Sequence, residues 1–134
     1  MACAAALATI EAIEHENLSA RAMKIGERFE SRAREWKKRW PLVGDVRGLG
    51  AMCAIELVHS GEERKPAKEE TDQILRYCHE HGLILLSAGS YGNVIRILVP
   101  LVVTDEQFDE GMGVLEEAFA AVAASRLEAE PRPA

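Results

Sequence analysis

The chain has 134 residues, of which 48% are hydrophobic and 28% charged, and this composition is typical of one globular domain with its own core. A net charge of −6 without a long basic cluster argues against nucleic acid or anionic membrane as a partner, because both need a positively charged surface. No apolar run approaches the roughly 20 residues that span a bilayer, and no signal peptide is visible. Three cysteines in apolar segments, Cys3, Cys53 and Cys78, predict packed, reduced thiols in a cytoplasmic protein.

Two helices are predicted first. Residues 1–14 ("MACAAALATIEAIE") are rich in strong helix formers, and the opening, 2–8, is apolar on every side without a capping side chain before it. We expect this helix to be part of a longer polypeptide chain from which the sequence was truncated. A second helix starts at Asn17 or Ser19 and ends at Pro41. Spacings of three and four predict its buried stripe: Leu18, Ala22, Ile25, Phe29, Ala33, Trp36 and Trp40.

Two extended segments joined at Gly48 and Gly50 follow within residues 43–58. In the second, one side of the strand is apolar, because Cys53, Ile55 and Leu57 alternate with Ala54 and Glu56. A polar loop over 59–68, closed by Pro66, leads to a third helix over 68–81 that stops at Gly82. The residues of this helix predicted to face inward are Ile74, Leu75 and Cys78.

The last third of the chain predicts two strands and a helix. "LILL" (83–86) predicts a short buried strand, "SAGSYGN" a turn, and 94–98 a second strand. Thr104 and Gln107 form a capping box for a helix whose predicted stripe is Phe108, Met112, Leu115, Phe119 and Val122. Together the elements predict an α+β fold, a small, largely antiparallel sheet packed against helices. Residues 125–134 predict a disordered tail.

Arg96 is the most informative single residue, because it lies between Ile95 and Ile97 in a predicted strand. We expect it to be buried, and a buried guanidinium without a partner costs several kcal/mol, so it needs an anion. We therefore hypothesise that Arg96 binds a carboxylate. Two structural alternatives remain open: an edge-strand arginine that reaches solvent, or an ion pair with Glu56 across the sheet.

The residues before this strand favour the binding hypothesis. Gly89, Gly92 and Asn93 form a possible active-site loop, since glycines let backbone approach a small ligand closely.

Other motifs carry little chemistry. "RGLGAM" lacks the third glycine and the following helix of a dinucleotide site. His79 and His81 do not share a helix face, so no metal site is predicted. No lysine follows an apolar strand, where burial would activate it for covalent catalysis, and no catalytic residue is therefore expected in this chain. The lysines are Lys24, Lys37, Lys38, Lys65 and Lys68.

Three blocks, "ACAAALATIEAIEHENL", "VGDVRGLGAMCAIEL" and "GLILLSAGSYGNVIRILVPLVVTDEQFDEGMGVLEEAF", together resemble the C-terminal small domain of class III pyridoxal-phosphate aminotransferases. The resemblance is closest to the members that act on 4-aminobutyrate (GABA), and "SAGSYGNVIRILVPL" is its most specific part. It implies that residues 1–124 are the small domain of a fold type I enzyme and a fragment of a longer chain.

The resemblance also implies an activity. Such enzymes are homodimers that move the amino group of 4-aminobutyrate, or a similar ω-amino acid, to 2-oxoglutarate, giving succinate semialdehyde and glutamate. Arg96 matches the family's arginine for the α-carboxylate of glutamate or 2-oxoglutarate. The Schiff-base lysine and the phosphate site for pyridoxal 5'-phosphate would lie in a large domain outside this chain, which should be inactive alone.

Other functions stay open at this point. The chain could serve as a stand-alone module that binds a dicarboxylate or helps an assembly form, or it could belong to another class III ω-amino acid aminotransferase. A purely structural domain, whose first helix and one sheet face await a partner, is a further alternative.

Overall fold

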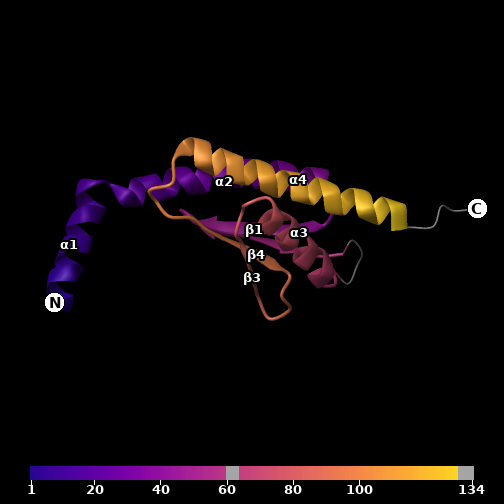
Figure 1. Ribbon diagram of the computed structural model, residues 1–134, viewed down its shortest axis with the longest axis horizontal. Helices are drawn as coiled ribbons and strands as arrows, with labels where there is room; N and C mark the ends of the chain where they lie inside the picture. Colours follow the sequence, from indigo (N-terminus) through magenta and orange to yellow (C-terminus); the bar gives the residue numbers. More distant parts are fainter. Residues whose placement is uncertain (60–63, 130–134) are drawn as a thin grey trace, which may run out of the picture.

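A computed structural model of the chain describes residues 1–59 and 64–129 (Figure 1). The predicted α+β class is confirmed, because helices pack against a small antiparallel sheet. No helix of the described residues combines the length and the apolarity that a membrane crossing needs. In chain order the elements are α1 (Ala2–His15), α2 (Leu18–Arg39), β1 (Val43–Leu49), β2 (Met52–Leu57), α3 (Lys68–Glu80), β3 (Leu86–Ala88), β4 (Val94–Leu98) and α4 (Asp105–Ala129).

The sheet has the strand order β1-β2-β4-β3, and all neighbouring strands are antiparallel. Strand β4 therefore lies inside the sheet, between β2 and β3. The predicted alternation is confirmed on β2, where Cys53, Ile55 and Leu57 are buried, and it continues on β4 with Ile95 and Ile97. These side chains join the core formed with α2, α3 and α4. The opposite face of the sheet carries the exposed positions of both strands.

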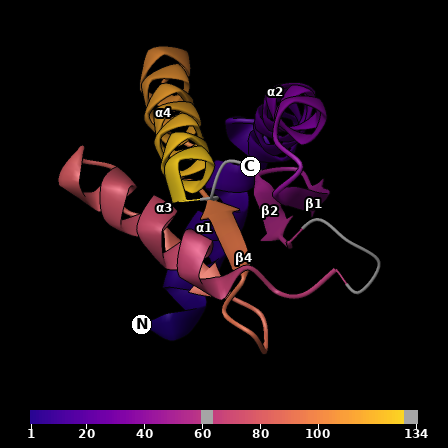
Figure 2. The same cartoon turned by 90° about the vertical axis from the view of Figure 1, so that its right-hand side faces the viewer.

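Helices α2 and α4 lie side by side over the sheet (Figures 1 and 2). The predicted stripe of α2 is largely confirmed, because its buried residues are Ile25, Phe29, Ala33, Trp36 and Trp40. All five residues of the predicted stripe of α4 are buried as well. The aromatic rings at their contact are close, with centroid distances to Phe119 of 5.6 Å from Trp36 and 5.2 Å from Trp40. Aromatic burial on this scale is a large share of a small core.

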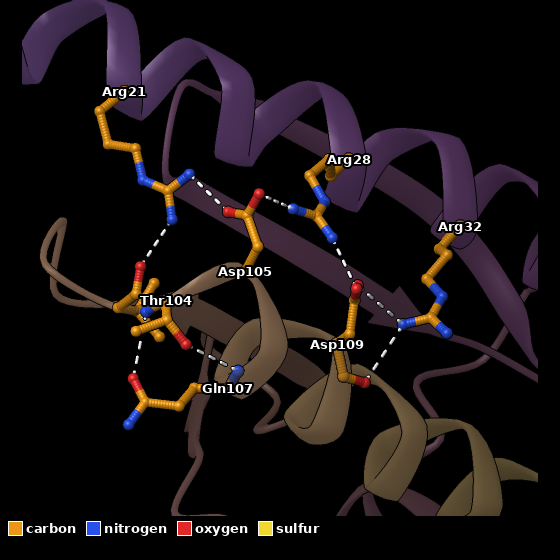
Figure 3. Close-up of polar contacts among 8 residues, drawn as sticks. Arg21, Arg28, Arg32, Thr104, Asp105, Gln107 and Asp109 are labelled. Carbon is orange, nitrogen blue, oxygen red and sulfur yellow. Dashed lines mark hydrogen bonds and ion pairs between the residues drawn. The ribbon is translucent and has the colours of Figure 1, made fainter.

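A row of ion pairs runs along the outer edge of the same helix pair (Figure 3). The carboxylate of Asp105 forms ion pairs with Arg21 and Arg28, each with a nitrogen–oxygen distance of 2.7 Å. The carboxylate of Asp109 pairs with Arg28 at 2.6 Å and with Arg32 at 3.6 Å. Exposed pairs of this kind contribute up to about 1 kcal/mol each, so they fix how α2 lies along α4 more than they stabilise the fold. Arg21 also donates to the Val103 carbonyl at 2.6 Å, just before α4.

The predicted capping box of α4 is confirmed. The Thr104 amide donates to Gln107 Oε1 at 3.1 Å, and the Gln107 amide donates to Thr104 Oγ1 at 3.2 Å (Figure 3). The reciprocal bonds satisfy two amides that the first turn of a helix leaves without partners. They fix where α4 starts, and with it the position of the ion pairs on Asp105 and Asp109.

The prediction of a buried strand at 83–86 is wrong. Strand β3 begins only at Leu86, and both Ile84 and Leu86 are exposed, at 77% and 59%. The reason is that β3 is an edge strand beside the uncovered sheet face, while Leu83 and Leu85 are the residues that contact the core.

Two further expectations need correction. Helix α4 continues to Ala129, so residues 125–129 are not part of a disordered tail; the Ser125 hydroxyl bonds the Ala121 carbonyl within that helix. Residues 130–134 lie outside the described part, as does the segment 60–63 of the predicted loop. Cys53 and Cys78 are buried as predicted, but Cys3 is exposed because no residue of α1 is buried.

Helix α2 approaches the β1–β2 turn closely at Gly26. A Cβ added there would lie 2.3 Å from the Gly50 carbonyl oxygen, which is itself fixed by a turn with φ +54° at Gly50. The side chain must therefore be a hydrogen for α2 to lie on the hairpin.

We expect Gly26→Ala to lower the free energy of unfolding by about 1–3 kcal/mol, because the methyl group forces α2 away from the hairpin. Gly113→Ala is the matched control: Gly113 is also inside a helix, a Cβ added there would meet nothing within 4 Å, and alanine should stabilise the protein by about 0.5–1 kcal/mol. Urea unfolding measures both. Equal shifts for the two variants would contradict the close approach.

Candidate functional site

Arg96 points to the open face of the sheet, away from the helices. Its Cα neighbours are Ala54 on β2 and Leu86 on β3, and its side chain is exposed, whereas the flanking Ile95 and Ile97 are buried. The expectation that Arg96 is buried is therefore wrong for this chain. The physical reason is that helices cover one sheet face only, and strand alternation assigns Arg96 to the other.

Of the two structural alternatives for Arg96, the first is right that the side chain reaches solvent and wrong about the edge strand, and the ion pair with Glu56 is absent among the described residues. Arg96 is not on an edge strand, because β4 lies between β2 and β3. Glu56 does not pair with it either, since Glu56 Oε2 accepts from Arg47 Nη1 at 2.7 Å. Among the described residues, Arg96 has no hydrogen bond or ion pair. Its guanidinium is thus a cation available to an anion that approaches the open face.

A second arginine, Arg47, lies on the same face and is neutralised. Arg47 on β1 is a Cα neighbour of Ala54, which separates it from Arg96. Its Nη1 donates to Asp45 Oδ2 at 2.9 Å as well as to Glu56. Hydrogen bonds to Asp45 and Glu56 raise the pKa of Arg47, and the bond from Arg47 lowers the pKa of Asp45. The two arginines therefore differ sharply in the charge that surrounds them.

Apolar side chains occupy the rest of the open face. Leu49, Met52 and Leu98 form one cross-strand row and are 73%, 61% and 56% exposed. Leu86 lies directly beside Arg96 and is also exposed. An exposed apolar patch beside a cation that has no described partner is typical of a surface that is covered during function.

The predicted loop residues have identifiable structural roles. Gly89 and Gly92 take positive φ values of +79° and +64°, which lets the chain turn from β3 into β4. Asn93 is 3% exposed, and its side-chain amide donates to the Leu57 carbonyl at 2.8 Å. Asn93 thus anchors the loop to the end of β2. A direct contact of these three residues with a ligand stays a prediction.

Among the described residues, a hollow and two buried thiols are the other candidates for a site. A hollow between α2 and the β1–β2 hairpin is lined by Met23, Gly26, Val46 and Cys53 among others, and it includes none of the predicted site residues. Burial raises the pKa of the Cys53 thiol, and that of Cys78 to about 11, so neither is an activated nucleophile. No cluster of three potential metal ligands occurs among the described residues.

All five lysines are described, and all are exposed. Lys37 lies 3.9 Å from Asp45, Lys38 lies 2.6 Å from Glu35, and Lys68 pairs with Asp72 on the same helix. Desolvation, the usual means of activating a lysine amine, is therefore missing at these positions.

Sequence reasoning missed Arg47. The signal was present, because Asp45 and Arg47 alternate along one extended segment and Glu56 faces the same side of the next. Strands β1 and β4 each pair with β2, on opposite sides of Ala54. This arrangement depends on contacts between residues far apart in the sequence, so the local pattern does not predict it.

Asn93→Ala should lower the free energy of unfolding by about 1–3 kcal/mol, because it leaves the buried Leu57 carbonyl without one hydrogen bond. Ser90→Ala, at an exposed position of the same loop, is the control and should change stability by less than about 0.5 kcal/mol. Thermal unfolding compares the two. A neutral Asn93→Ala would show that the anchor is unimportant for folding.

Comparison with known proteins gives one consistent result. The family model for class III aminotransferases matches residues 1–119. A probable 4-aminobutyrate aminotransferase of Bacillus subtilis is 47% identical over 116 residues, and a 5-aminovalerate aminotransferase of Pseudomonas putida is 48% identical over 123 residues. These matches cover 87% and 92% of this chain but 27% and 29% of the relatives.

A solved structure, a Bacillus anthracis aminotransferase, superposes with a TM-score of 0.81 at 34% identity, covering 90% of this chain and 28% of that one. The chain thus spans a little more than a quarter of the length of each of these three proteins.

Proposed function

Because the chain belongs to the class III aminotransferase family, we propose that it is part of a transaminase that moves the amino group of 4-aminobutyrate, or a similar ω-amino acid, to 2-oxoglutarate, giving succinate semialdehyde and glutamate. The observation that carries the proposal is the guanidinium of Arg96, which has no described partner on the open sheet face, in a chain whose relatives include proteins named 4-aminobutyrate and 5-aminovalerate aminotransferases. Relatives named for 4-aminobutyrate and 5-aminovalerate match almost equally well, so the proposed donor is an unbranched ω-amino acid.

In this proposal Arg96 binds the α-carboxylate of 2-oxoglutarate or glutamate. A guanidinium presents a planar fork of N–H donors that a carboxylate accepts bidentately. The small Ala54 beside it leaves room above β2, and the exposed Leu86 lies on its other side. Once the open face is covered, these apolar neighbours exclude water, which strengthens the interaction between the two charges.

We propose that pyridoxal 5'-phosphate is the cofactor of the whole protein and supplies the electron sink for amino-group transfer. The residues of this chain do not by themselves form its site, because all five lysines are exposed and none lies beside Arg96 in the sheet. The proposal therefore places the Schiff-base lysine in a large domain of the same enzyme, which contacts this domain. The whole enzyme is proposed to be a cytoplasmic homodimer. The support for a large domain is that this chain covers only 27% and 29% of the two relatives.

The test of the Arg96 assignment uses a full-length enzyme that carries this segment. Arg96→Ala should lower kcat/KM for 2-oxoglutarate by about 30- to 1,000-fold, or about 2–4 kcal/mol, because it removes one side of a charge pair. The value for 4-aminobutyrate should change much less. Arg76→Ala removes an exposed arginine of α3 that has no described partner, and it should leave both half-reactions unchanged. Equal losses in both half-reactions for Arg96→Ala would refute the assignment.

The isolated chain provides an independent test. Mixed with pyridoxal 5'-phosphate, it should show no stable absorbance band of a lysine-bound cofactor and no transamination, because its lysines are solvated or paired. The readouts are the absorption spectrum and glutamate formation. Turnover by the chain alone would contradict the proposed division between domains. A saturable rise in melting temperature with 2-oxoglutarate, without turnover in the full-length enzyme, would instead favour a dicarboxylate-binding module.

A further inference from the structure

We propose that Arg47 is a positioning residue for Arg96: by holding Glu56, it prevents that carboxylate from neutralising Arg96 and so leaves Arg96 open to the substrate carboxylate. The inference rests on the proposed function, which gives Arg96 its ligand. Arg47 itself would touch neither substrate nor cofactor. Its effect would pass through Glu56, and the strand register shows why these three residues are coupled.

Glu56 is placed symmetrically between the two arginines. Arg47 and Arg96 are both Cα neighbours of Ala54, one from each side of β2. Glu56 lies two residues beyond Ala54 on the same face, and it is therefore diagonal to both. Diagonal neighbours in an antiparallel pair are about 7–8 Å apart at Cα, within reach of long side chains. Two guanidinium groups thus compete for one carboxylate.

In the structure Glu56 is bound by Arg47 and not by Arg96. The Nη1 atom of Arg47 lies 2.7 Å from Glu56 Oε2 and 2.9 Å from Asp45 Oδ2, while Arg96 has no described partner. Asp45 and Glu56 are also direct cross-strand neighbours, and like charges at that position repel. A cation between them relieves this repulsion. On the other side of β2 the direct cross-strand neighbour of Glu56 is the uncharged Val94, so no second carboxylate there holds a cation beside Glu56 as Asp45 does with Arg47.

The four strands place two carboxylates on the open face, Asp45 and Glu56, and Arg47 contacts both. Lys37, at 3.9 Å from Asp45, adds a second cation to this group from α2. Without Arg47, Asp45 would push Glu56 toward the remaining arginine of the face. An incoming carboxylate would then have to displace Glu56 before it could bind Arg96.

The chemical reactivity of each arginine in the 134-residue chain tests the proposal. Phenylglyoxal, a dicarbonyl reagent, reacts with the unprotonated guanidine, so a bound carboxylate slows it; peptide mass spectrometry gives a rate for every arginine. In the unchanged chain Arg96 should react faster than Arg47. In Arg47→Gln the Arg96 rate should fall by about three- to fivefold, the effect of one exposed ion pair. Arg76, exposed and without a described partner, is the internal standard.

Two further variants separate positioning from a structural role. Arg47→Lys keeps a cation between the carboxylates, so the Arg96 rate should stay at its original value. In Arg47→Gln combined with Glu56→Gln, the Arg96 rate should recover, because the competing carboxylate is gone. An Arg96 rate that is unchanged in Arg47→Gln overturns the proposal. A fall that the second substitution does not reverse also overturns it, because Glu56 would then not be the cause.

Glu56→Gln alone keeps the test decisive if Arg47→Gln does not fold. It should accelerate modification of Arg47 and leave that of Arg96 unchanged; acceleration at Arg96 would mean that Glu56 occupies it, which overturns the proposal. A separate measurement in the same experiment tests the proposed function. In the unchanged chain, 2-oxoglutarate should protect Arg96 and not Arg76. Failure of this protection would count against the carboxylate role of Arg96, while the pattern among the variants would still decide the role of Arg47.

Discussion

The alternation of side chains along β2 and β4 is the constraint on which the rest of the molecule depends. Ile55, Ile95 and Ile97 are buried under the helices, and this fixes the orientation of both strands. A slip of one residue would exchange the two faces and bring a guanidinium into the core. The apolar residues on either side of Arg96 therefore orient it more firmly than any contact of its own.

The rest of the fold holds this sheet in place. The aromatic contact of Trp36 and Trp40 with Phe119 joins α2 to α4, and the ion pairs of Asp105 and Asp109 set their alignment. Gly26 lets α2 lie directly on the β1–β2 hairpin. The open face thus belongs to a sheet whose other face is packed against helices, which suits a site whose residues must keep a fixed spacing.

Local signals predicted much of this structure. The strand 94–98, the capping box of Thr104 and Gln107, the stop at Gly82 and the stripe of α4 all follow from short-range rules, and all are confirmed. The errors on the strand at 83–86 and on the burial of Arg96 share one cause. Whether "LILL" or Arg96 is buried depends on what covers each face of the sheet, and periodicity identifies the two faces without saying which of them is covered. The ligand role of Arg96, Gly89, Gly92 and Asn93 remains a prediction for the same reason.

Helix α1 is not packed against the core, and this has a consequence for its stability. Its 14 residues bury no side chain, and Leu7, Ile10 and Ile13 are exposed along it. Isolated helices of about this length are only marginally stable in water. Apart from its junction with α2, little therefore stabilises the helical conformation of α1. In solution it would fray and re-form continually, and its amide protons would exchange quickly with solvent. Docking against another surface would slow that exchange, which makes the winding of α1 a sensitive indicator of assembly.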